Sequence, residues 1–238
     1  MTSRKLVEEM IGVSEKMAEN LKKSASESTE IFASSHLDLV VLDEMLQDIK
    51  ESEKSEAISV LNEAIWDMFS SIYLAASGLY RTSFMALRSA LELGLAFLYF
   101  HDHNYDYLLW KKNLFDLQWI KLSDPNEGIV TTFYLRFFCE GLGEDKAKAI
   151  CKDTKDLYRI CSEYVHGKFI YMHTINTNEI QFSEENLNEW HKLFHDLSRI
   201  LIILILLRFN SVHIVGSSGS HMKELVSQFS EVLPIEQG

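Results

Sequence analysis

The sequence is poor in residues that interrupt helices, with two prolines, Pro125 and Pro234, and ten glycines in 238 residues. Proline removes a backbone donor and clashes with the preceding helical turn, so this scarcity favours long helices over many short strands. Cysteine is also rare: Cys139, Cys151 and Cys161 are the three, and no Cys-x-x-Cys spacing occurs. This set excludes a disulfide framework and a cysteine zinc site. It favours a reducing compartment, with the cysteines packed as small apolar groups.

Positive charge is scarce as well, because 23 Lys and Arg stand against 35 Asp and Glu, for a net charge of -12. A net negative charge repels other polyanions at long range and is a poor global signature of a nucleic-acid binder. Residues 144–178 are the exception, with six basic and five acidic residues. The charge of this segment is compatible with binding RNA.

No hydrophobic run is long enough to predict a membrane span. The run from Ile200 to Leu207 has eight apolar residues between Arg199 and Arg208, whereas a spanning helix needs roughly 20. We expect a core helix that is hydrophobic on all sides because it is surrounded by protein. The N-terminus MTSRKLVEEMIGVSEKM also lacks the apolar stretch of a signal peptide. These features predict a cytoplasmic protein with no membrane partner.

Apolar residues recur at helical spacing along most of the chain. One example is the series Ile58, Leu61, Ile65, Met68 and Ile72, whose spacing of threes and fours is typical of an amphipathic helix. We therefore expect an all-α fold, a bundle of about seven helices.

The expected organisation is a helical core with two extensions. Residues 57–209 should form the core, and residues 1–56 should form N-terminal helices that act as a solvated arm. Residues 210–238 should be a linker and C-terminal tail, since they include the linker-like GSSGSHM at 216–222. Within the core, the β-branched and aromatic residues of 168–182 favour either a short β-hairpin or an ordered loop.

The first group of residues that could carry chemistry is the pair Arg159 and His166. Seven residues at 100° each make nearly two helical turns, so both side chains should share one helix face. An arginine that neutralises a phosphate and a histidine that moves a proton are sufficient to cleave RNA without a metal. The alternative is a histidine that caps the helix end beside a surface arginine.

The second group is Arg81, Arg88 and Glu92, which also share one helical face. Charges in so apolar a stretch are costly to bury unless they are paired. Arg88 and Glu92 are spaced as an i,i+4 ion pair, and such a pair can be purely structural. An unpaired Arg81 at a cleft would instead bind an anion.

Other signals are weaker. His191 and His195 stand one helical turn apart, as two metal ligands do, but no third ligand is evident in the sequence, so a solvated helix face is favoured. The chain has no glycine-rich phosphate loop, no GxSxG and no HExxH. We predict neither a metal nor another cofactor.

Two segments together resemble the HEPN superfamily: LYRTSFMALRSALELGLAFLYF at 79–100 and LYRICSEYVHG at 157–167. The resemblance covers roughly residues 57–209 and is closest to small bacterial proteins of phage-defence loci. HEPN proteins are helical bundles, commonly homodimers, and many are metal-independent ribonucleases. Their motif is an Arg and a His with four to six residues between them.

The resemblance implies roles for individual residues. Arg159 and His166, with six residues between them, would be catalytic: His166 as general acid and base, and Arg159 as the group that stabilises the phosphate. The remaining candidates are those that would bind phosphate or RNA (Arg81, Arg88, Lys155, Lys168) and those that would support the site (Glu92, Ser162, Tyr164).

Two functions follow from the resemblance. The first is an endoribonuclease acting as a toxin or effector in phage defence, as a homodimer with RNA as substrate. The second is a non-catalytic module that binds a regulatory protein partner or a nucleotide and regulates a neighbouring enzyme. Ile160 favours the second, because active HEPN ribonucleases usually carry a polar residue after the arginine.

Overall fold

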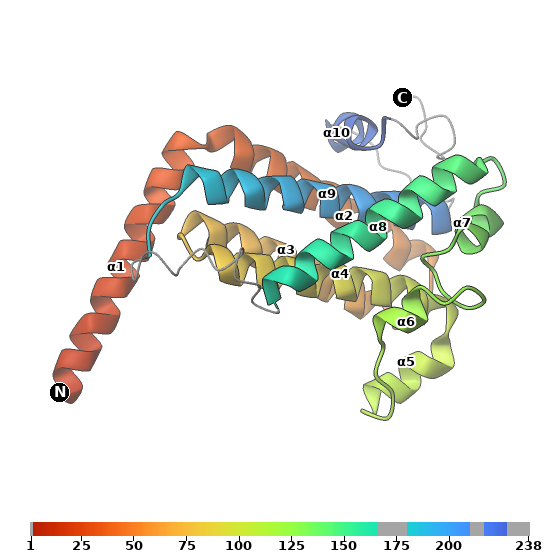
Figure 1. Cartoon of the computed structure of the whole chain (residues 1–238), viewed down its shortest axis with the longest axis horizontal. Coiled ribbons are helices and arrows are strands. Elements are labelled where there is room, and N and C mark those ends of the chain that lie inside the picture. The colour runs from red at the N-terminus through yellow and green to blue at the C-terminus, as the bar shows by residue number, and fades with distance from the viewer. Residues whose placement is uncertain (1, 166–179, 210–216, 228–238) are drawn as a thin grey trace.

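Ten helices and no strand make up the part of the chain that the computed structural model describes, residues 2–165, 180–209 and 217–227 (Figure 1). The predicted all-α bundle is therefore confirmed, and the helices beyond the expected seven are short. In chain order they are α1 (Ser3–Glu27), α2 (Thr29–Ser52), α3 (Ile58–Ala76), α4 (Tyr80–Asp102), α5 (Asn104–Lys111), α6 (Trp119–Leu122), α7 (Thr132–Phe138), α8 (Glu144–Val165), α9 (Glu184–Arg208) and α10 (Ser217–Leu225).

Four long helices form the centre of the molecule. α2 packs against α3, α3 against α4, α4 against α9, and α9 returns to α2, which closes a four-helix bundle. α8 contacts both α4 and α9 and runs obliquely across them (Figure 1). The two segments that carry the HEPN resemblance, on α4 and α8, are therefore neighbours in space.

α9 is the buried helix that its composition predicts. Every residue from Ile200 to Leu207 is at most 2% exposed, as expected for a helix with protein on all sides. Its far end is tied to α4, because the Arg208 guanidinium donates to both carboxylate oxygens of Asp102. Tyr134 of α7 donates to the same carboxylate at 2.7 Å. One charged group thus joins three helices.

α4 is the described helix whose length and composition would suit a membrane span, although the bundle accounts for its apolar character. In the apolar window of this helix, 67% of the residues are buried inside the protein. Its partners are α3, α8 and α9, which surround it on several sides.

Two segments assigned to the extensions pack against the core instead. α2 lies within residues 1–56, yet Leu42, Met45, Leu46 and Ile49 are fully buried, because their spacing of threes and fours forms a core face. α10, which begins inside the GSSGSHM stretch, packs on α2. Among the described residues of the two extensions, only the N-terminal half of α1 projects as a solvated arm.

The turn between α3 and α4 and the start of α9 each depend on one residue. Gly78 adopts a φ of 84° between α3 and α4, where a Cβ would lie 2.8 Å from the backbone oxygen of Gln181, so both conformation and space require glycine there. Ser183 caps α9 by accepting from the Asn186 amide at 3.3 Å. The expected hairpin or loop at 168–182 lies mostly outside the described residues.

Candidate phosphate-binding site along α8

Arg159 lies near the C-terminal end of α8 and is exposed. Its guanidinium is 3.3 Å from Glu163 and 3.8 Å from Asp156, both on the same helix. His166 follows Val165, the last residue of α8, and lies outside the described residues, as does Lys168. The predicted pairing of Arg159 with His166 therefore stays a prediction.

Arg88 links the two segments of the resemblance. From α4, its Nε donates to Ser162 Oγ on α8 at 3.1 Å, and its Nη1 is 2.5 Å from Glu92 Oε1. Its guanidinium carbon lies 4.0 Å from the centre of the Tyr158 ring. The predicted Arg88–Glu92 ion pair is present, and the Arg88 side chain is only 11% exposed. Arg88 thus serves as an inter-helix contact whose charge is already neutralised.

The Tyr158 ring of α8 packs between Trp119 of α6 and Arg88 of α4. It stacks on Trp119 of α6, with ring centres 3.8 Å apart, while Arg88 lies within cation–π distance of the same ring. Burial raises the pKa of the Tyr158 hydroxyl, so this group stays protonated at neutral pH. Tyr158 was not singled out from the sequence, since stacking between distant segments leaves no local pattern.

Two other predicted residues differ in burial: Arg81 is exposed, whereas Tyr164 is buried. Arg81 is exposed on α4, and no carboxylate of the described residues pairs with it. Tyr164 is buried, stacks on Phe84 with ring centres 4.0 Å apart, and donates to Glu189. Tyr164 therefore holds α8 against α4 and α9, whereas Arg81 is available to an anion.

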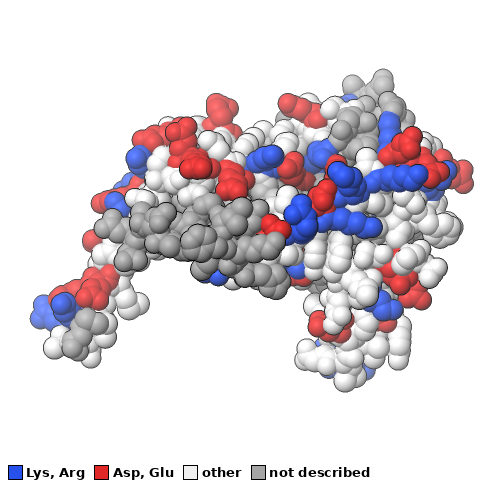
Figure 2. Space-filling model, in the orientation of Figure 1, with Lys and Arg blue, Asp and Glu red and all other residues white. Residues whose placement is uncertain are grey.

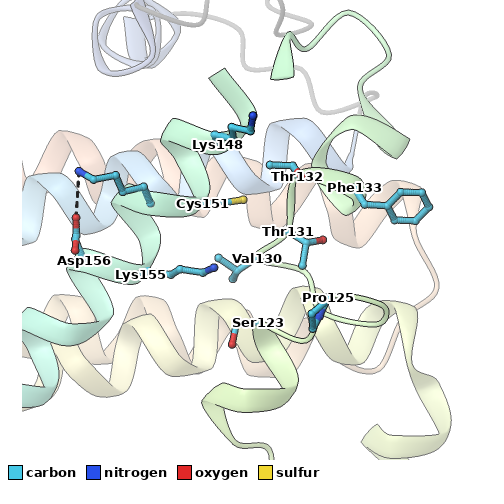
Figure 3. A pocket seen from close by; sticks show the side chains of 11 residues that line it. Ser123, Pro125, Val130, Thr131, Thr132, Phe133, Lys148, Cys151, Lys155 and Asp156 are labelled. Carbon is cyan, nitrogen blue, oxygen red and sulfur yellow. Dashed lines mark ion pairs between the residues drawn. The ribbon is translucent and has the colours of Figure 1, made fainter. Parts of the chain in front are cut away.

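An open pocket of about 560 Å³ lies beside α8 (Figure 3). One wall is a row of α8 side chains, and the other is the turn and helix start at 123–133. Lys155 points across the pocket toward the turn that carries Thr131 (Figure 3). The lining residues are Ser123, Pro125, Val130, Thr131, Thr132, Phe133, Lys148, Cys151, Lys152, Lys155 and Asp156.

The three lysines of the pocket differ in how far they are neutralised. Lys148 is 2.7 Å from Glu144, and Lys152 is 3.4 Å from Asp156. Within the described part of the chain Lys155 forms no ion pair, so its charge is available to a ligand. Figure 2 shows Lys and Arg side chains gathered over the region of α8, on a surface that is otherwise rich in acids.

Cys151 and Cys161 do not contribute a nucleophile to this site. Burial raises the pKa of Cys151 to about 11 and that of Cys161 to about 12. The thiolate is the reactive form, so both residues behave as the small packed groups that the sequence predicts.

A second polar cluster lies between α2, α9 and α10. The buried Asp38 carboxylate is 2.6 Å from His221 Nε2 and 3.3 Å from His195 Nδ1. His191 Nε2 lies 2.9 Å from Ser34 Oγ. The sequence drew attention to His191 and His195 but not to their neighbours, because Asp38 and His221 come from distant segments. No three His, Cys, Asp or Glu side chains among the described residues are placed to hold a metal ion.

Comparisons with family models, with curated proteins and with solved structures give no match to this chain.

Proposed function

We propose that the protein is a metal-independent endoribonuclease of HEPN type that binds RNA along α8. The observation that carries this proposal is the Arg88–Ser162 hydrogen bond of 3.1 Å, which joins residues 74 apart in the chain. It brings the two segments of the HEPN resemblance together. Arg159 follows Tyr158 on the same helix, so the proposed catalytic arginine lies next to the residue on which Arg88 and Trp119 pack.

The pocket supplies a place for a phosphate that flanks the cleaved bond. Lys155 is exposed and free of carboxylates among the described residues, whereas the hydroxyls of Ser123 and Thr131 already donate to the carbonyls of Trp119 and Gly128. Lysine is an ordinary contact to phosphate oxygens. Lys155 precedes Arg159 by four residues, about one helical turn, so the flanking phosphate and the reacting one would lie along one side of α8.

In the proposed reaction, His166 removes the proton from a ribose 2′-hydroxyl, and the oxygen attacks the adjacent phosphorus. Arg159 stabilises the extra negative charge on the phosphorane. The bond to the 5′-oxygen then breaks, and a proton is returned to that oxygen, which leaves a 2′,3′-cyclic phosphate. One imidazole serves as base and then as acid, a role suited to its pKa near neutrality.

The test is cleavage of total RNA and of tRNA in EDTA by the wild type, His166→Ala and Arg159→Ala. The proposal expects fragments with 2′,3′-cyclic phosphate ends from the wild type and a loss of roughly a hundredfold or more in either variant. Equal fragmentation by all three proteins would remove both residues from the catalytic role.

A non-catalytic binding module is the second candidate, and the surroundings of Arg159 favour it. Its guanidinium is paired with Asp156 and Glu163, and RNA would have to displace at least one of these carboxylates. Expression toxicity in a bacterial host separates the two functions. Toxicity that Arg159→Ala or His166→Ala relieves supports the nuclease, whereas a non-toxic wild type that leaves RNA intact supports the module.

A further inference from the structure

α1 leaves the bundle as a projecting arm (Figure 1). Its C-terminal half is held to the turn after α3, where Asn20 Nδ2 donates to the Ser77 carbonyl at 3.3 Å and Ser24 Oγ donates to the Ala76 carbonyl at 2.9 Å. Residues 2–16 are all exposed. Since α1 is one continuous helix, these contacts also fix the direction of its exposed half.

The exposed half of α1 carries an apolar stripe. Leu6, Met10 and Val13 are 45%, 70% and 48% exposed and follow one another at helical spacing, and Val7 and Ile11 widen the stripe. Isolated helices of this length are marginal in water even with good propensity. A contiguous apolar surface on such a helix indicates an interaction site.

A groove of about 600 Å³ between α2 and α3 is the complementary surface. Its apolar lining includes Val40 and Trp66, which are 43% and 56% exposed. No residue of α1 lines it. The groove is therefore uncovered by the arm of its own chain, whose direction leads away from the bundle (Figure 1).

The charges of the arm and the groove are also complementary. Residues 36–49 of α2 and 58–76 of α3 contain acidic residues but no Lys or Arg. At the tip of the arm, Arg4 is 3.0 Å from Glu8 of the same helix, whereas Lys5 forms no ion pair with the described residues. Asp43 and Glu44 line the apolar groove, so the groove suits a helix that is apolar on one face and carries an unpaired lysine at its end.

We propose that the α1 arm of one copy lies in the α2–α3 groove of a second copy, so that two chains exchange arms. Reciprocal exchange uses the same two surfaces twice and closes a two-fold dimer. The exchange covers both the apolar stripe and the groove. Within one chain the two surfaces do not meet, because the arm points away from the groove. The proposal is independent of the ribonuclease activity, since neither surface includes a residue of α8.

The first experiment measures mass in solution across a concentration series. The wild type should have twice the monomer mass of 27.5 kDa. Met10→Asp in the stripe and Trp66→Asp in the groove should each shift the equilibrium to the monomer, by at least tenfold in dissociation constant. Gly12→Asp adds the same charge on the opposite side of α1, where no neighbour lies within 4 Å, and should stay dimeric.

The second experiment locates the contact with engineered cysteines. A chain carrying both Met10→Cys and Trp66→Cys should form an intermolecular disulfide, and a mixture of the two single variants should form a mixed one. Circular dichroism of each variant confirms that the bundle remains folded. Because Met10 and Trp66 are exposed, the substitutions leave the core intact.

Three results would overturn the proposal. One is a wild type that is monomeric at all concentrations, in which case another protein covers the stripe. Another is a dimer that persists in both Met10→Asp and Trp66→Asp. The third is an efficient disulfide in Met10→Cys alone, since this would mean that the arms pair with each other instead of entering the grooves.

Discussion

At the scale of single residues, Arg88 connects α4 to α8 through its hydrogen bond to Ser162, its ion pair with Glu92 and its contact with the Tyr158 ring. Glu92 is half-exposed, so solvent screens part of the ion pair. The hydrogen bond and the ring contact are better shielded. Arg88 therefore has a positioning role, which is to fix the helix that carries Arg159.

A double-mutant cycle tests this role. Arg88→Ala should lower the free energy of unfolding by about 2 kcal/mol, because it removes the donor and leaves the Ser162 acceptor without it. Ser162→Ala should cost less, and the two effects should couple by about 1 kcal/mol in urea denaturation. Strict additivity would show that the 3.1 Å hydrogen bond contributes nothing to stability.

Asp38 makes a second prediction, which concerns pH. The Asp38 carboxylate, 3.3 Å from His195 Nδ1, raises the pKa of His195 above its ordinary 6.5, against the opposing effect of burial. A histidine with a raised folded-state pKa contributes stability that is complete below the unfolded pKa and is lost as pH rises through the folded pKa. Burial lowers the pKa of His191, so that residue works in the opposite direction.

Asp38→Asn keeps the shape of the side chain and removes its charge. The wild type should be more stable than this variant, and the difference should widen as pH falls from about 8 to about 6. Urea denaturation at several pH values measures it, with His191→Gln as a control that removes only the opposing histidine. A difference that does not change with pH would mean that protonation of His195 is not coupled to Asp38.

Individual residues were predictable where their partners lie close in the sequence. The Arg88–Glu92 pair, for example, follows from i,i+4 spacing on one helix. Ser162 as the partner of Arg88, and His221 as the partner of Asp38, join segments 74 and 183 residues apart. No local pattern encodes such distances, so these contacts became visible only in the folded chain.

At the scale of helices, the approach of α4 to α9 depends on Gly94. A Cβ at this position would lie 2.6 Å from Leu201 Cδ2, in a fully buried interface. Gly94→Ala should therefore destabilise the protein by about 1–3 kcal/mol through overpacking, although alanine favours the helix by about 1 kcal/mol. Thermal or urea unfolding measures the net effect.

Gly12→Ala is the matched control, since it makes the same change in α1, where nothing lies within 4 Å. It should raise helix content without lowering the unfolding midpoint, because only the propensity of alanine acts there. If Gly94→Ala were as harmless as Gly12→Ala, the close contact between Gly94 and Leu201 would not limit the packing of α4 on α9.

Helices were predictable where composition alone decides burial. The run at 200–207 could only be a core helix, because it has no polar face. α2 was harder to place: its charged residues suggest a solvated helix, while a core face is hidden among them. α10 was missed because Gly and Ser in GSSGSHM indicate a linker, and its helix packs on α2 through Met222 and Leu225, which are buried.

At the scale of the whole molecule, the question is how a chain of net charge -12 would hold RNA. The charge is unevenly distributed, and basic side chains gather over the region of α8 (Figure 2). Electrostatic attraction would therefore act locally, over about one Debye length of 8 Å at physiological salt. The long-range attraction of RNA to the protein should be weak, and RNA should bind at the pocket that contains Lys155.

Charge reversal tests the location of this binding. Lys155→Glu should weaken the binding of a short single-stranded RNA at low salt by roughly tenfold, and it should reduce the salt dependence because one phosphate contact is lost. Lys22→Glu makes the same charge change at an exposed position on α1 and should leave the affinity nearly unchanged. Equal losses in both variants would mean that RNA responds only to net charge.

The most direct measurement of the central claim is RNA cleavage in EDTA by the purified wild type beside His166→Ala, with the fragment ends analysed chemically. The proposed function predicts fragments with 2′,3′-cyclic phosphate ends from the wild type and their near-complete loss in His166→Ala. Intact RNA with the wild type, or the same fragments from both proteins, would contradict it.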